Sequence, residues 1–157
     1  NQTDLQLYNV QQWRLEAKGS EAQDNKVMIT GFYHVALMGN WAKLASEQLR
    51  LLDKSGLLRG SSRKLVVGVV GESNAEKKFM DLVNSLNLTH AHKIKVGLTR
   101  DSAMYEWVTL NTLRRHCQKH LTDPETAPKH LVYYLHTKGV THNMATEEGR
   151  RVQNWRR

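Results

Sequence analysis

The stretch Val27-Met-Ile-Thr-Gly-Phe-Tyr-His-Val-Ala-Leu37 decides the fold. It is a continuous run of apolar, β-branched and aromatic residues, and Gly39-Asn40 punctuates its end. A run of this kind is typical of a strand that is covered on both faces. We therefore expect a buried β-strand over residues 27–37.

The same pattern of an apolar run followed by a helical periodicity continues along the chain. The expected strands are 27–37, 65–70, 94–98 and 131–135, and the expected helices are 41–54, 73–86 and 102–121. Asn40 can cap the first helix, and Ser73-Asn-Ala-Glu76 has the form of a capping box for the second. Strands that alternate with helices imply right-handed βαβ units. We therefore expect an α/β fold with a mostly parallel, Rossmann-like sheet and helices on both faces.

Length and composition indicate one globular domain, because 157 residues with 39% apolar and 24% charged residues are ordinary for a folded chain. No apolar run approaches the ~20 residues that cross a bilayer, so we expect no membrane span. We expect a peripheral helix and linker over 1–26 and the α/β domain over 27–157. The chain starts at Asn1 without Met and stops at Arg157, so it looks like a fragment whose sheet is incomplete at the C-terminus. Both a cytoplasmic and a secretory-lumenal location stay open.

The carboxyl ends of the expected strands are where a ligand should bind. In open parallel sheets the loops at this edge lead into helix N-termini, whose free N–H groups favour anions. Cationic and donor side chains stand in these loops. The expected phosphate-binding residues are Asn40, Ser73, Arg100, His136, Thr137 and Lys138. Their chemistry indicates a phosphate or diphosphate ligand.

Several residues allow two interpretations. His136-Thr-Lys-Gly139 follows a fully apolar strand, and it is either the rim of a pocket or a surface turn. Tyr33 and His34 either line the pocket or belong to the core. Trp155-Arg156 either contacts the ligand or forms an ordinary helix face.

Other common site types are disfavoured. Neither Gly-x-Gly-x-x-Gly nor Gly-x4-Gly-Lys-Ser/Thr occurs, which argues against a dinucleotide-binding or P-loop enzyme. His116 and His120 are one helical turn apart and can chelate zinc, but no Glu follows His116 as in the metalloprotease motif. We expect this pair to be a solvated helix face, and we expect no protein metal site.

Several motifs, in order, resemble a family of nucleotide-diphospho-sugar transferases with a His-Thr-Lys-Gly motif. The matching pieces are Tyr33-His-Val-Ala-Leu-Met-Gly-Asn-Trp41, Glu47-Gln48, Ser55-Gly-Leu57, Val67-Gly-Val-Val-Gly71, Tyr105-Glu-Trp-Val-Thr-Leu110, Leu135-His-Thr-Lys-Gly139 and Asn154-Trp-Arg156. The His-Thr-Lys and Trp-Arg pieces are also similar to rhamnan-synthesis-type glycosyltransferases. The resemblance covers residues 27–157 and implies a GT-A-like fold that binds an activated sugar at the carboxyl edge of the sheet.

The resemblance implies a glycosyltransferase that moves a sugar from a nucleoside-diphosphate donor to a carbohydrate or other hydroxyl acceptor. Many such enzymes hold Mn²⁺ or Mg²⁺ with an Asp-x-Asp motif, which does not occur in this sequence. His136-Thr-Lys138 stands in the corresponding place, so dependence on a divalent metal stays open. If the reaction inverts the sugar, a base must deprotonate the acceptor. The candidates at the edge are Asp101, Glu72 and His136.

Two alternatives belong to other classes of protein. One is a non-catalytic nucleotide- or sugar-binding domain. The other is a nucleic-acid-binding domain, which the net charge of +8 would favour. The basic residues are spread over several expected helices, however, and the standard nucleic-acid-binding motifs are missing. We therefore expect no nucleic-acid partner.

Overall fold

The computed structural model describes residues 27–100, 104–125 and 127–137. In chain order its elements are β1 (Met28–Ala36), α3 (Trp41–Ser55), β2 (Arg63–Val70), α4 (Ala75–Ser85), η1 (Ala91–Lys93), β3 (Ile94–Arg100), α5 (Trp107–His120), η3 (Ala127–Lys129) and β4 (His130–His136). The four expected strands and three expected helices are confirmed. The helix expected within residues 1–26 lies outside the described residues.

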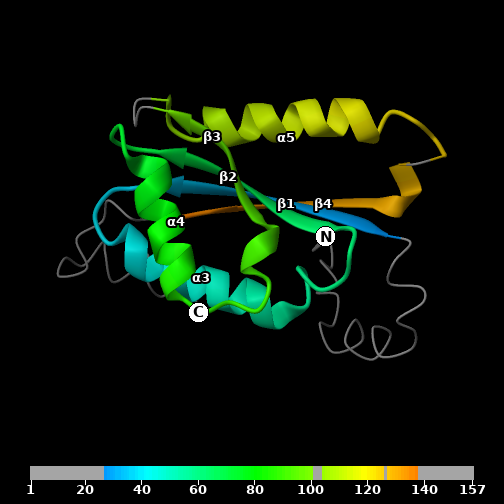
Figure 1. Ribbon diagram of the computed structural model, residues 1–157. Coiled ribbons are helices and arrows are strands. Elements are labelled where there is room, and N and C mark those ends of the chain that lie inside the picture. The colour runs from blue at the N-terminus through cyan, green and yellow to red at the C-terminus, as the bar shows by residue number, and fades with distance from the viewer. Residues whose placement is uncertain (1–26, 101–103, 126, 138–157) are drawn as a thin grey trace, which may run out of the picture.

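The four strands form one parallel sheet in the order β3-β2-β1-β4. Helix α5 covers one face of the sheet, and α3 and α4 cover the other (Figure 1). This arrangement confirms the expected Rossmann-like α/β fold. Strands β1 to β3 are added in one direction, and the chain then crosses back to place β4 on the opposite side of β1. The direction of winding therefore reverses between β1 and β4.

The larger core cluster lies between the sheet and the helices α3 and α4. Its fully buried members include Tyr33 and Val35 from β1, Leu49 from α3 and Phe79 from α4. Successive residues of a strand point to opposite faces, so the even-numbered residues of β1 face α5 instead. This alternation places Tyr33 and His34, which are adjacent in the sequence, in different layers of the fold.

A glycine in β1 makes room for an aromatic ring of β4. Gly31 and Tyr133 are paired in the register of the two strands, and a Cβ atom at Gly31 would collide with the tyrosine ring. The ring therefore occupies the space that a side chain at position 31 would fill. Tyr133 also packs against the larger core cluster.

Several sequence-based boundaries are wrong, and backbone geometry explains them. The helix expected to begin at residue 102 begins at Trp107, because Tyr105 has φ 44°, in the left-handed region that a helix excludes. Asn40 and Asn74 precede α3 and α4, but neither makes a side-chain capping hydrogen bond. The expected capping box is also wrong, because α4 begins at Ala75 after Asn74.

The expectation that His116 and His120 form a solvated helix face is wrong. The ring of His116 lies edge-on against the buried ring of Phe32, with 5.3 Å between ring centres. Both histidines are half-buried because this side of α5 faces the sheet, where it also meets His130. No helix in the described part of the chain combines the length and apolar character needed to cross a membrane, in agreement with the sequence.

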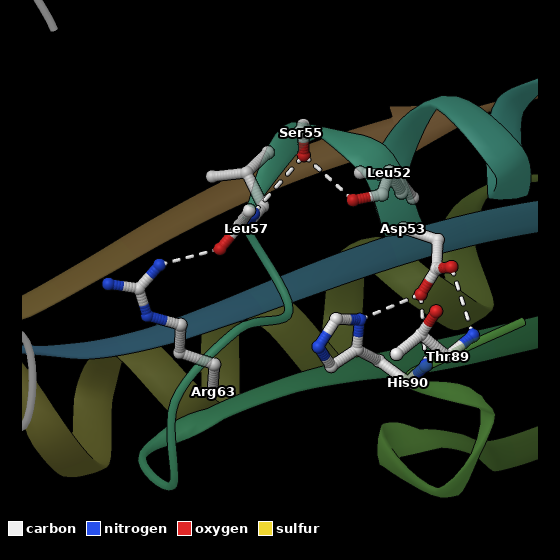
Figure 2. A network of polar contacts seen from close by, with 8 residues as sticks. Leu52, Asp53, Ser55, Leu57, Arg63, Thr89 and His90 are labelled. Atoms are coloured by element: carbon white, nitrogen blue, oxygen red, sulfur yellow. Dashed lines mark hydrogen bonds and ion pairs between the residues drawn. The ribbon is translucent and has the colours of Figure 1, made fainter. Parts of the chain in front are cut away.

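A partly buried carboxylate joins α3 to the loop before β3 (Figure 2). Asp53 accepts hydrogen bonds from the backbone N–H groups of Thr89 and His90, at 3.0 and 2.9 Å. Its Oδ1 also lies 2.8 Å from Nδ1 of His90. Burial by itself raises the pKa of Asp53, but the hydrogen bonds from Thr89 and His90 outweigh it and leave the pKa below its usual value. The ionised carboxylate therefore stabilises the fold.

We expect Asp53→Asn to lower the free energy of unfolding by about 1–3 kcal/mol at pH 7, because the charge of a partly buried acceptor and one of its accepting oxygens are lost. The native pKa of Asp53 is depressed, so this stabilisation is present above the pKa of the unfolded chain and is lost as the pH falls through the native pKa. Urea denaturation across pH 7 to 3 measures it. Asp81→Asn is the matched control, since Asp81 forms an exposed pair with Lys77. A difference from wild type that stays constant with pH would contradict the assignment.

Candidate active site

The carboxyl ends of β1 and β4 are tied together by the backbone and by one threonine. The N–H of Thr137 donates to the carbonyl of His34 at 3.0 Å. The N–H of Ala36 donates to Oγ1 of Thr137 at 3.2 Å. Thr137 is 5% exposed, so in the structure its hydroxyl joins two strands. This junction lies at the point where the winding of the sheet reverses, which is where open α/β sheets bind ligands.

Gln48 of α3 supports this junction from the opposite face of the sheet. The hydroxyl of Tyr33 donates to Oε1 of Gln48 at 2.7 Å, and Nε2 of Gln48 donates to the carbonyl of His136 at 3.2 Å. Burial raises the pKa of the Tyr33 hydroxyl far above its usual value. Tyr33 therefore positions Gln48 and does not share a pocket with His34, which faces α5.

On the α5 face, a carboxylate holds two side chains of β4. Oε1 of Glu106 lies 2.9 Å from Nδ1 of His136, and Oε2 accepts a hydrogen bond from the Tyr134 hydroxyl at 3.0 Å. The side chains of His136 and Glu106 are 34% and 43% exposed, so solvent and small molecules can reach both. A carboxylate bound to one nitrogen of an imidazole is the arrangement that prepares a histidine for proton transfer.

Glu106 is ionised in this environment. Burial by itself raises its pKa, but the hydrogen bond from Tyr134 and the neighbouring His136 outweigh that effect and leave the pKa below its usual value. Glu106 also precedes the first residue of α5, where the partial positive charge of the helix N-terminus stabilises an anion. A stable negative charge therefore lies beside two aromatic side chains that can donate protons.

His34 is the neighbour of His136 in the register of β1 and β4. It is 4% exposed, and its Nδ1 lies 3.0 Å from Oγ1 of Thr109 on α5. Burial lowers the pKa of His34, although the negative charge of Glu106 opposes this effect. His34 is therefore a neutral histidine of the core, hydrogen-bonded beneath the Glu106–His136 pair.

The backbone just before Glu106 is strained. Tyr105 has φ 44°, although it is not a glycine, and 71% of its surface is exposed. A left-handed conformation costs an ordinary residue about 1–2 kcal/mol. Strain of this kind concentrates at functional sites. Here it accompanies the turn that presents the Glu106 carboxylate to β4.

The structure brings together only some of the residues expected from the sequence. His136, Thr137 and His34 meet at the β1–β4 junction. Glu72 does not join them, because its side chain is 81% exposed and pairs with Lys78 at 2.9 Å. Ser73 is exposed, and Asn40 has a buried Oδ1 without a hydrogen-bond partner at the start of α3. Asp101, Lys138, Trp155, Arg156 and the side chain of Arg100 lie outside the described residues.

Four residues of the site were not predicted as site residues: Gln48, Glu106, Thr109 and Tyr134. The first three stand in the sequence pieces that carry the family resemblance, but no role was assigned to them. Alternate residues of a strand lie on the same face, so the sequence could have placed Tyr134 beside His136. Glu106 stands immediately before the apolar positions of α5, where acidic residues favour a helix start. Nothing local indicates that its carboxylate contacts β4, because the two elements are distant in the sequence.

Comparison with known families matches residues 32–157 to "Domain of unknown function (DUF8361)". The chain belongs to the DUF8361 family. The match includes the carboxyl half of β1, the whole of β4, and Glu106 with the helix α5 that follows it. No curated protein and no solved structure matches the DUF8361 chain. The resemblance to nucleotide-diphospho-sugar transferases therefore stays a prediction.

We expect Tyr134→Phe to raise the pKa of Glu106, because the variant lacks the hydroxyl that donates to the ionised carboxylate. A carboxyl-carbon NMR titration measures this shift. Tyr133→Phe is the matched control on the adjacent residue, since the Tyr133 hydroxyl is buried without a hydrogen-bond partner. If both variants titrate like wild type, the hydrogen bond from Tyr134 does not control Glu106.

We expect Gly68→Ala to destabilise the domain by about 1–3 kcal/mol, because a Cβ atom there would collide with the Thr109 side chain. Gly68 is the partner of His34 in β2, so the collision also disturbs the His34–Thr109 hydrogen bond. Chemical denaturation of the single variants and of Gly68→Ala/Thr109→Ala measures the coupling. Strictly additive effects would show that the two positions do not compete for space.

Proposed function

We propose that this DUF8361 domain is a glycosyltransferase that binds a nucleoside-diphosphate sugar at the carboxyl edge of its sheet. The observation that carries the proposal is the Glu106–His136 pair at the junction of β1 and β4. In this reading the pair acts as the general base for a hydroxyl acceptor. A non-catalytic nucleotide- or sugar-binding domain is the alternative, and the experiments below separate the two.

The helix N-termini at this edge support an anionic donor. Helices α3 and α4 begin directly after the loops that follow β1 and β2. The side chains of Asn40 and Asn74 do not cap these helices. A phosphate oxygen would therefore not compete with them for the N–H groups of the first turns. The sequence adds Arg100 and Lys138 as cations that would neutralise a diphosphate.

In the proposed chemistry, His136 takes the proton of the acceptor hydroxyl. In the tautomer with a proton on Nδ1, His136 donates to Glu106 and leaves Nε2 free to accept a proton. The acceptor hydroxyl gives its proton to Nε2 as its oxygen bonds to the anomeric carbon of the sugar. The bond from that carbon to the diphosphate oxygen breaks, and the nucleoside diphosphate leaves with the electron pair. Glu106 stabilises the imidazolium that forms.

We expect His136→Asn and Glu106→Gln to lower turnover at least 100-fold, the range in which a general base contributes, while affinity for the donor changes less than about threefold. Calorimetry with UDP- and GDP-sugars measures affinity, and release of the nucleoside diphosphate measures turnover. Asp81→Asn is the control. Donor binding without any turnover in wild type would favour the non-catalytic alternative, and no donor binding would refute both readings.

We expect Lys138→Ala to weaken donor binding at least tenfold, because a cation that pairs with the diphosphate is lost. Calorimetry of the variant against wild type, at low and high salt, measures the effect. Equal affinity would remove Lys138 from the proposed donor site and leave the assignment of His136 and Glu106 untouched.

A further inference from the structure

Exposed apolar side chains gather on both sides of Glu106. The described part of the chain has seven exposed large hydrophobic residues, and four of them lie within residues 104–110: Met104, Tyr105, Trp107 and Leu110. Tyr105 is the most exposed of the seven, and Trp107 is 58% exposed. Apolar side chains that gather on one exposed surface mark a place where another molecule binds. The proposed function uses none of these four side chains.

Helical geometry places two of them on the solvent side of Glu106. The backbone of Glu106 already has helical angles, φ −71° and ψ −15°, and each residue of a helix turns by about 100°. Leu110 therefore lies about 40° from Glu106 around the axis of α5, and Trp107 lies about 100° away in the same direction. The buried Thr109 lies about 60° away in the opposite direction. The Glu106 carboxylate therefore stands at the border between the buried side of α5 and its exposed apolar side.

Tyr105 extends the apolar surface into the turn before α5. Its backbone has φ 44°, a conformation that glycine adopts readily and that costs other residues energy. A tyrosine nevertheless stands here, with most of its side chain in solvent. Neither burial nor backbone preference explains an aromatic residue at this position, which favours a role of the ring in binding.

We propose that Tyr105 and Trp107 form an aromatic platform that binds a pyranose ring of a carbohydrate acceptor beside the Glu106–His136 pair. This inference rests on the proposed function, which requires a hydroxyl acceptor without naming its class. A pyranose ring carries C–H groups on its faces and hydroxyl groups around its rim. The C–H groups have a partial positive charge and are attracted to the negative face of an aromatic ring. The hydroxyl groups donate hydrogen bonds to a carboxylate.

Charge assigns this surface to the acceptor and not to the donor. The ionised carboxylate of Glu106 repels a diphosphate placed beside it, whereas the N-termini of α3 and α4 favour the anion. A carboxylate has about four positions that accept hydrogen bonds, and His136 and Tyr134 occupy two of them. The other positions are available to a neutral ligand that is rich in hydroxyl groups and rests on the aromatic platform.

The direct test measures sugar binding without donor or turnover. The chain is labelled with fluorotryptophan, and the fluorine NMR signal of Trp107 is assigned by its loss in Trp107→Phe. The probes are disaccharides of glucose, galactose, mannose, N-acetylglucosamine and rhamnose in both anomeric linkages. We expect at least one of them to shift the Trp107 signal in a saturable way. Glycerol, which has hydroxyl groups but no ring face, is the control and should leave the signal unchanged.

Three results of this titration would overturn the proposal. The first is the absence of a saturable shift with every disaccharide. The second is a shift with UDP or GDP but with no sugar, which would assign the aromatic platform to the nucleobase of the donor. The third is a shift that grows with protein concentration in the absence of sugar, which would assign this surface to a second copy of the chain.

Variants separate binding from folding. We expect Trp107→Ala and Tyr105→Gly to weaken disaccharide binding at least tenfold. Glycine accepts φ 44° without strain, so Tyr105→Gly should unfold at a Tm no lower than that of wild type, and its loss of binding cannot come from misfolding. Leu51→Ala removes an equally exposed apolar side chain from α3 and should bind as wild type does. Wild-type affinity in both Trp107→Ala and Tyr105→Gly would contradict the proposal.

A transferase assay distinguishes this inference from the proposed function. We expect Trp107→Ala to raise KM for the acceptor at least tenfold while the affinity for the donor, measured by calorimetry, stays that of wild type. Turnover with an unchanged acceptor KM in Trp107→Ala would refute the aromatic platform and leave the transferase standing. Sugar binding at Trp107 without any turnover in wild type would refute the transferase and leave the carbohydrate site standing.

Discussion

Parallel pairing of β1 on both of its edges is the constraint on which the rest of the domain depends. Strand β2 occupies one edge of β1 and β4 occupies the other. A parallel neighbour needs a crossover, so the chain must travel from β3 over the face of the sheet before β4 can pair. Helix α5 makes that crossing and brings Glu106 to one end of β4 and His116 to the other.

The two ends of the α5–β4 contact differ in charge, and this difference separates their chemistry. At the carboxyl end, histidines adjoin a carboxylate that stays ionised, so a proton can move to an imidazole that has a counter-ion. At the amino end, histidines adjoin one another and Lys64, and the pKa values of His116 and His130 are lowered by burial and by these neighbours. The first environment keeps a negative charge beside an imidazole, and the second favours neutral imidazoles.

Most of the fold could be predicted from the sequence, because apolar runs such as 27–37 and helical spacing such as that of α3 are local signals of burial. The site was less predictable for the same reason. His136 was found because a polar residue after an apolar strand has no packing role, whereas Glu106 acquires its role from a contact with a distant strand. His116 and His120 were misread because one helix pattern cannot show that Phe32 and His130 lie beneath it. The left-handed turn at Tyr105 had no local signal, since the residue is not a glycine.

The ring of Tyr133 over Gly31 has a consequence for how this sequence can change. Position 31 accepts a larger residue only when position 133 becomes smaller, because one volume is shared by two strands. Sequences with this fold should therefore change positions 31 and 133 together, so that the combined volume of the two side chains stays nearly constant. Correlated substitutions at these two positions, which are far apart along the chain, would indicate the β1–β4 pairing from sequence alone.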